Sequence, residues 1–453
     1  MLTALKLNLR ISLKSFDSHF WIPAFFVLLR IIPITSELSY ILLAGYALLG
    51  RQQVVESLFL TWFFTLINYE IAPITEFGSL TRYVVLAFCI FSIVMRSNFL
   101  KIDRLVILTL ALGLFILIHS IFFSFSPIIS ILKVISWLSV IIILILAWEG
   151  MSTSQYEYSK KWITNFLIII LILSLPILFI PEVGHSRNMT NFQGTLNHPQ
   201  AFGLTAAGLC ALLIGQLVSG LSNKFLIFVN IFISIAFIFF SGSRTAGIAL
   251  ILAIPISVIT FYLINFSRIN LKIRFKLNKY FLIILFLFVP IILHFDTRLY
   301  ELIISYMTKT EQFNIKSIFV AYKISREVLY EPMISNILEN TIFGIGFGIA
   351  SDPLSMNTIY FNSIPISAPI EKGVLPLAII EEIGFFGLIF FMIWILMLIK
   401  RAGGINFGAL FVLTTFLMFN LGEAGLFSPN GYGLLYLLII SSVIIKPKNF
   451  EKR

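Results

Sequence analysis

Charged residues are scarce in this chain. Only 12% of its 453 residues are Asp, Glu, Lys or Arg, whereas 59% are hydrophobic and the mean hydropathy is +0.99. A soluble globular domain carries about 25% charged residues. The composition therefore excludes an ordinary soluble domain and a charge-rich disordered chain, and it predicts an all-α polytopic membrane protein.

Cysteine and histidine are also rare, with two and five copies respectively. Cys89 and Cys210 both lie in apolar runs, which does not suit a disulfide framework, and no His/Cys/Asp cluster has metal-ligand spacing. The sequence also contains no P-loop and no dinucleotide-binding fingerprint. We therefore expect neither a metal nor a cofactor.

Long apolar runs, by contrast, fill most of the chain. About 14 of them approach the ~20 residues that a helix needs to cross a bilayer. The runs are 20–34, 37–50, 54–69, 80–97, 104–124, 127–148, 162–181, 201–219, 224–241, 244–265, 280–295, 374–399, 405–421 and 430–446. The second and third runs are short, and the count falls to about 12 if they are a broken pair.

Basic residues outnumber acidic ones by 32 to 21, which gives a net charge of +11. They cluster in short connections between apolar runs, as the positive-inside rule predicts for cytoplasmic loops, so we expect no nucleic acid partner. These clusters fall on one side of the predicted bundle: Arg51, 96–104, Lys160-Lys161, Lys224, 268–279, Lys400-Arg401 and 446–453. Both termini are then cytoplasmic, and Lys6, Arg10 and Lys14 before the first run indicate a retained span rather than a cleaved signal.

One long interval, 295–373, carries charges throughout and divides the chain into three parts. Spans and short loops occupy 1–295, the interval itself 296–373, and further spans with a cytoplasmic tail 374–453. Backbone in the bilayer core must be helical or in a closed barrel, so we expect this interval to form an extracytoplasmic cap with amphipathic helices, or to line a cavity. A helix is predicted from Lys316 to Asn340, interrupted near Pro332, and a glycine-rich turn follows at 344–348.

The opposite side of the bundle from the basic clusters receives Tyr69–Leu80, Pro181–Gln200, the turn at 242–244, the long interval and Gly422–Asn430. The segment 241–247 (Ser-Gly-Ser-Arg-Thr-Ala-Gly) joins two apolar runs there, and the second helix starts in it. Free N–H groups at a helix start favour an anion, Ser243 is a candidate cap, and the Arg244 fork suits phosphate oxygens. We predict a diphosphate site, the alternative being an arginine that snorkels to outer headgroups.

A second polar segment, 194–203, lies at the same boundary, and Pro199 is suited to the first turn of a helix. Its polar side chains either bind a sugar or cap that helix, and we expect Asn197 to be the cap. The candidate sugar-binding residues from this loop are Arg187, Asn197, His198 and Gln200.

The long interval supplies the remaining candidates. Lys323 and Arg326 share a helix face, which makes Arg326 a second candidate phosphate ligand or an ordinary solvated charge. Glu371 and Lys372 precede the next apolar run, and Glu381 and Glu382 lie inside it. A carboxylate within the membrane usually faces a cavity or partner, and two adjacent residues point in different directions, so we expect only one of the pair to line a site. Lys133 and His119 are further polar residues near helix ends, where snorkelling is common.

In order and spacing, these segments resemble the O-antigen ligase and O-antigen polymerase (Wzy-like) superfamily of bacterial envelope proteins. The matching pieces cover roughly residues 180–400: 194–201, 241–246, Arg326 before an amphipathic helix, 342–348, and Glu382-x-Gly384 followed by Phe386-Gly387. The amino-terminal spans match only in hydropathy.

The resemblance implies glycan transfer on the outer face of the bacterial cytoplasmic membrane. A glycan leaves an undecaprenyl diphosphate carrier and joins an acceptor sugar hydroxyl, without metal or nucleotide, and a chain-length regulator protein is an additional expected partner. The family arginines that hold the diphosphate map to Arg244 and Arg326. Ser243, Lys372 and Glu382 then lie among the substrate-binding candidates.

The chain departs from the ligase pattern at one point, because the His-Asn pair expected before the next span is replaced by Ile370-Glu371-Lys372. This favours a polysaccharide polymerase with Glu371 as the base, and Glu382 or His198 as alternative bases. Two other functions stay open: ligase-type transfer to a different acceptor, and transport or flipping of a lipid-linked glycan.

Overall fold

The computed structural model describes residues 21–75, 78–97, 103–219, 224–266, 318–361, 364–368, 370 and 372–447. The first helices are α2 (Trp21–Ile31), α3 (Ser36–Ala47), α4 (Arg51–Leu66), α5 (Gly78–Val94), α6 (Arg104–Phe123), α7 (Pro127–Gly150) and α8 (Thr153–Ile177). They are followed by α9 (Pro181–Gly184), α10 (Pro199–Val218), α11 (Lys224–Phe240), α12 (Arg244–Asn265), α15 (Ile318–Glu339), α16 (Leu375–Ile405), α17 (Phe407–Phe419) and α18 (Tyr432–Ile444). A two-stranded antiparallel hairpin, β1 (Ile359–Phe361) and β2 (Ile364–Ser367), interrupts this series.

This architecture is that of an all-α polytopic membrane protein. Within the described residues, six helices are long and apolar enough to cross a membrane: α6, α7, α8, α10, α12 and α16. Four shorter apolar helices, α5, α11, α17 and α18, accompany them. Each lies close to a run predicted from sequence, and the predicted run 280–295 falls outside the described residues.

The broken span is not the pair that we expected. The helices α2 and α3, which correspond to the first and second runs, meet at an angle of 107° and together form one candidate span. A proline disfavours helical backbone in the residue before it, and Ile32 before Pro33 is extended (φ −76°, ψ 122°). The third run forms a separate helix, α4.

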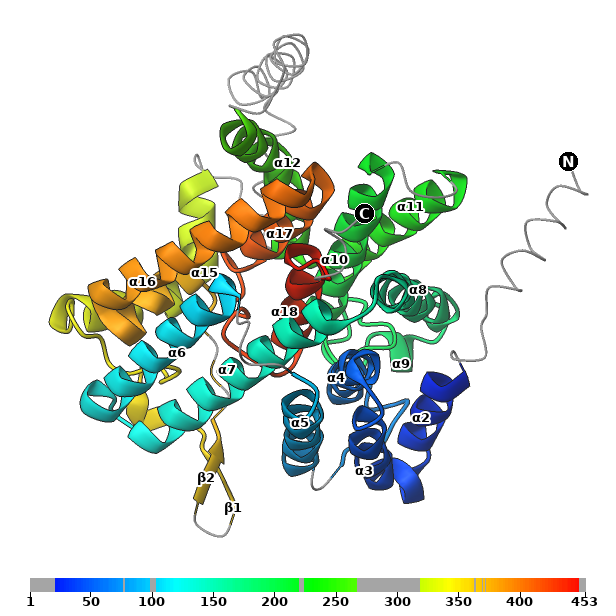
Figure 1. Ribbon diagram of the computed structural model, residues 1–453, viewed down its shortest axis with the longest axis horizontal. Helices are drawn as coiled ribbons and strands as arrows, with labels where there is room; N and C mark the ends of the chain where they lie inside the picture. The colour runs from blue at the N-terminus through cyan, green and yellow to red at the C-terminus, as the bar shows by residue number, and fades with distance from the viewer. Residues whose placement is uncertain are drawn as a thin grey trace, which may run out of the picture.

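The centre of the bundle is built from helices that are apolar all round. Most residues of α10, α17 and α4 are buried, and so is nearly every residue of α18. Helices α6, α7 and α16 lie side by side at one edge of the bundle (Figure 1). By contrast, α11 and α12 expose large apolar side chains such as Phe232 and Leu263, as expected of surfaces that face lipid.

Residues from three of the basic clusters form contacts between helix ends. The guanidinium of Arg51 donates to the carbonyl of Arg96, and Arg96 donates in turn to the Leu48 carbonyl at 2.5 Å. Arg401 forms an ion pair with Asp103, which caps the start of α6. The contacts therefore place the ends of α3 and α5 beside the start of α4, and the end of α16 beside the start of α6.

The segments that we assigned to the opposite side also meet one another. The Asn68 amide, just after α4, donates to the carbonyls of Val183 (2.8 Å) and Gly194 (3.0 Å). The amide of Phe192 donates to the carbonyl of Phe240 at the end of α11, at 3.0 Å. These hydrogen bonds join the loops that follow α4, α8 and α11 into one layer at the other end of the bundle.

The described part of the long interval is folded. Its helix α15 runs without a break through Pro332, so the predicted interruption is wrong. A proline removes one backbone donor, and here the helix tolerates that loss. Lys316, the predicted start, lies outside the described residues. After α15 come the glycine-rich turn 344–348, a short 3-10 turn (Pro353–Ser355) and the β1–β2 hairpin, which the sequence did not predict.

Candidate functional site

The start of α12 is packed tightly against two neighbouring segments. Gly242 has φ +60°, and a Cβ there would lie 2.6 Å from the Asn191 side-chain oxygen. Gly203 of α10 lies so close to Ser243 that an added methyl group would collide with its side chain. Only glycine suits both positions, because the first needs left-handed backbone and the second needs close contact.

Arg244 is the first residue of α12 and is half-buried. Ser243 occupies the N-cap position and is 5% exposed, but in the structure its side chain makes no capping hydrogen bond, which corrects our expectation. Thr245 lies against Gly422 in the connection between α17 and α18. Arg244 therefore lies at a helix start where backbone N–H groups and the helix dipole favour an anion.

The loop before α10 is organised differently from our prediction. Pro199 starts the helix as expected, but the cap is His198, whose Nδ1 accepts a hydrogen bond from the Gln200 amide at 3.1 Å. The Asn197 side chain instead donates to the Tyr69 hydroxyl (3.2 Å) and ties the loop to the end of α4. Sequence could not show this, because the partner lies 128 residues away.

Other residues of this loop also form hydrogen bonds within the loop. Arg187 is exposed, and its backbone amide donates to the Gln193 side chain at 3.0 Å. Gln193 in turn donates to the Ser186 hydroxyl at 2.8 Å. The loop thus satisfies its own backbone with polar side chains and holds a fixed shape beside the start of α12.

Helix α16 is broken, and a segment of the long interval fills the break. Gly384 has φ 65° and ψ −171°, which interrupts the helical hydrogen bonds. The carbonyls of Glu381 and Glu382 instead accept hydrogen bonds from the amides of Ile345 (2.8 Å) and Gly346 (2.9 Å). The glycine-rich turn therefore replaces a missing helical turn, which is how a membrane helix can be interrupted without leaving polar backbone unsatisfied.

The glycines make this insertion possible. Gly344, Gly346 and Gly348 all have positive φ. A Cβ on Gly344 would lie 2.5 Å from the Glu381 carbonyl oxygen, and one on Gly346 would collide with Ser124 between α6 and α7. The turn is thus held between α16 on one side and the junction of α6 and α7 on the other.

Beside the break lies a buried group of charges, Lys372, Glu381 and Glu382, which we call the lysine–carboxylate cluster. The Lys372 Nζ atom is 2.7 Å from Glu381 Oε2 and 3.2 Å from Glu382 Oε1. The second oxygen of Glu381 accepts from the Asn336 amide, and that of Glu382 from the Gly348 backbone, each at 2.7 Å. Our expectation that only one carboxylate would face this site is wrong, because one ammonium with three donors reaches both.

Two polar residues of α7 complete the attachment of the glycine-rich turn. The Lys133 ammonium donates to the Gly348 carbonyl at 2.6 Å, and the Ser130 hydroxyl donates to the Phe347 carbonyl at 2.7 Å. On α6, the His119 ring contacts the Phe343 carbonyl. Lys133 and His119 therefore bind backbone of the long interval rather than snorkelling to headgroups.

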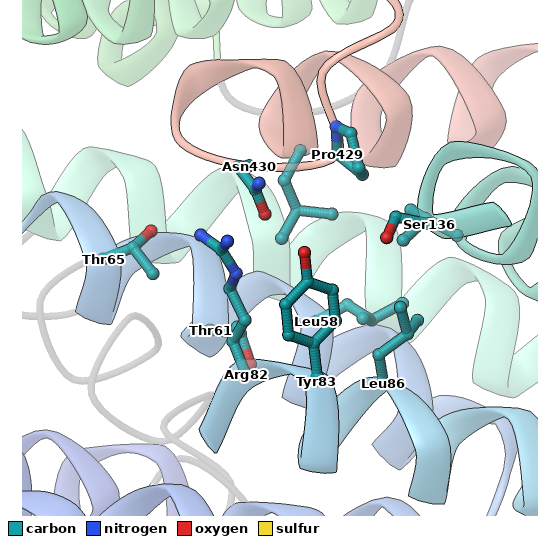
Figure 2. Close-up of a pocket in the computed structure, with 11 residues that line it drawn as sticks. Leu58, Thr61, Thr65, Arg82, Tyr83, Leu86, Ser136, Pro429 and Asn430 are labelled. Atoms are coloured by element: carbon teal, nitrogen blue, oxygen red, sulfur yellow. The ribbon is translucent and has the colours of Figure 1, made fainter. Parts of the chain in front are cut away.

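A small pocket lies between α4, α5, α7 and the segment before α18. Figure 2 shows the side chains of Arg82, Tyr83, Thr65 and Asn430 gathered around it. The Arg82 guanidinium lies 5.2 Å from the centre of the Tyr83 ring. The cavity volume is about 20 Å³, which is room for roughly one water molecule. Sequence reasoning missed Arg82, although an arginine at the outer end of a predicted span was a visible signal.

Two sets of the predicted site residues are brought together in the structure. The structure brings the loop 181–200 to the start of α12, and it brings Lys372 to Glu382. Arg326 lies on α15, ten residues before Asn336, and Glu371 lies outside the described residues. No protein-family model and no curated protein matches this chain.

Proposed function

We propose that this chain is a polysaccharide polymerase of the bacterial cytoplasmic membrane. It transfers glycan from an undecaprenyl diphosphate carrier to an acceptor sugar hydroxyl at the extracytoplasmic face. The bond between the sugar anomeric carbon and the diphosphate breaks, a glycosidic bond forms, and the hydroxyl proton passes to a base. The diphosphate leaves as an anion, so it needs stabilisation of charge rather than a metal-bound nucleophile.

The observation that carries the proposal is the position of Arg244. It is the first residue of α12, at the end of the bundle opposite the basic clusters, where three loops converge. The helix start and the planar guanidinium present donors of the kind that diphosphate oxygens accept. The resemblance described above assigns a second such role to Arg326 on α15.

The hydrogen bonds of the lysine–carboxylate cluster narrow the choice of base. Glu382 is 7% exposed, and its two oxygens already accept from Lys372 and the Gly348 amide. Both oxygens of this carboxylate are therefore occupied by hydrogen bonds within the protein, which makes it a poor candidate to accept the proton of a substrate hydroxyl. The base in this proposal is therefore Glu371, with His198 at the exposed start of α10 as the alternative.

Transport of a lipid-linked glycan is the second candidate function, and the break in α16 favours it. Transporters commonly bind substrate at discontinuous helices, and buried charges within spans often mark a transport route. Here the break at Gly384 lies beside Glu381, which is fully buried. Against transport, the described residues satisfy this break and its carboxylates internally, through the glycine-rich turn and Lys372.

The test uses Arg244→Lys and Arg244→Ala in purified protein reconstituted with an undecaprenyl diphosphate-linked oligosaccharide. Arg104→Lys and Arg104→Ala are matched controls, because Arg104 is also the first residue of a helix but lies at the opposite end. Loss of the paired donors should reduce polymer formation by about 10²-fold or more in both Arg244 variants, whereas both Arg104 variants should polymerise normally. Full polymer formation by Arg244→Ala would contradict the proposal.

A further inference from the structure

The side chain of Asn336 ties the carboxy-terminal part of α15 to the bundle, in addition to the backbone hydrogen bonds that join the segment after α15 to α16. The Asn336 amide nitrogen donates to Glu381 Oε1 and to the Ser351 carbonyl, both at 2.7 Å. Both hydrogens of the amide are therefore used, one toward α16 and one toward the segment after the glycine-rich turn. Nearby, Met333 is fully buried, whereas Ile334 and Leu338 on other faces of the helix are exposed.

Glu381 is held rigidly enough to serve as the anchor. Its side chain has no exposed surface, and its second oxygen lies 2.7 Å from the Lys372 ammonium. A buried carboxylate is tolerated only when it is paired and hydrogen-bonded, so removal of either partner costs much more than loss of a surface contact. Asn336 therefore binds an acceptor that cannot move without breaking a buried ion pair.

The geometry of a helix gives this attachment a long reach. Arg326 precedes Asn336 by ten residues, which corresponds to about 15 Å along a helix. A swing of about 10° around Asn336 would move the backbone at Arg326 by roughly 2.6 Å. Displacements of about 1 Å are enough to lower a catalytic rate substantially.

We infer that Glu381 is a positioning residue that acts through Asn336. It fixes the orientation of α15, and thereby the position of Arg326 relative to the start of α12. The attachment of α15 is a property of the fold, whereas the role given to Arg326 rests on the proposed function. Lys372 supports the same attachment because its ammonium pairs with the second carboxylate oxygen of Glu381.

The attachment is tested by hydrogen exchange on the full-length protein in lipid nanodiscs. Asn336→Leu removes both hydrogen bonds and leaves the ion pair intact, and it should raise exchange across 330–339 by about tenfold or more, as expected when a hydrogen bond to a charged group is lost. Glu339→Gln, an exposed change on the same helix, is the control and should leave exchange unchanged. Equal exchange in Asn336→Leu and the wild type would overturn the attachment.

The positioning role is tested by a double-mutant cycle with Arg326→Ala. Asn336→Leu should raise the KM for the lipid-linked donor about tenfold or more, with an unchanged KM for the acceptor and partial recovery in Asn336→Gln. If Asn336 acts through Arg326, Asn336→Leu should have no further effect in the Arg326→Ala background. Fully additive effects would overturn the positioning role. A wild-type protein without transferase activity would instead refute the proposed function, and hydrogen exchange would still decide whether α15 is attached in this way.

Discussion

Gly384→Ala is the most informative single substitution for the fold, because it tests the break in α16 directly. At φ 65° and ψ −171°, Gly384 occupies a backbone region that is essentially restricted to glycine. The new Cβ would also collide with the carbonyl of Ile342 and lie 2.7 Å from the Phe343 nitrogen. Backbone atoms cannot move aside as a flexible side chain can, so the glycine-rich turn would have to shift.

The expected loss of stability follows from these two effects. Strained backbone costs about 1–3 kcal/mol, and forced overpacking adds about 1–3 kcal/mol, so the total is on the order of 2–6 kcal/mol. The assay is thermal unfolding of purified protein in detergent, followed by loss of the monodisperse peak in size-exclusion chromatography. Gly404→Ala is the control, since Gly404 lies on the same helix with nothing within 4 Å of an added Cβ. Equal unfolding midpoints for the two variants would refute the broken-helix arrangement.

Three further predictions concern the cluster, the base and the topology. Lys372→Met leaves two buried carboxylates without their cation and should lower the free energy of unfolding by about 3–5 kcal/mol, as measured by thermal unfolding. Adding Glu381→Gln and Glu382→Gln should restore much of that stability, and unchanged stability in Lys372→Met would contradict the ion pairing. Glu371→Gln should lower the transfer rate by about 10²–10⁴-fold, while binding of the lipid-linked donor persists in a filter assay. A wild-type amount of polymer from this variant would assign the role of base to His198 instead. Reporter fusions at Lys309 and Asn449 should give opposite signals, and identical signals would refute the predicted orientation.

The membrane helices could be predicted from sequence because long apolar runs have few other stable structures. The run 244–265 coincides with α12, and 104–124 differs from α6 by one residue. Pro199 was placed correctly at a helix start for the same kind of local reason, since its missing N–H costs nothing there.

The contacts that define the site could not be predicted, because they depend on partners far away in the chain. The break at Gly384 is stable only because amides of the long interval occupy it. The assignment of the cap to Asn197 failed because Tyr69 binds that side chain, and the sequence shows no link between the two. From helix geometry alone, we expected only one of Glu381 and Glu382 to line a site, and the sequence does not show that one lysine reaches both.

The central claim is that the protein joins glycan units on a lipid diphosphate carrier. The most direct measurement is mass spectrometry of carrier lipids after purified protein in liposomes has been incubated with undecaprenyl diphosphate-linked repeat units. A polymerase should produce carriers that bear two, three and more repeats, together with one free undecaprenyl diphosphate for each bond formed. Carriers that keep a single repeat, whether or not they cross the bilayer, would contradict the claim.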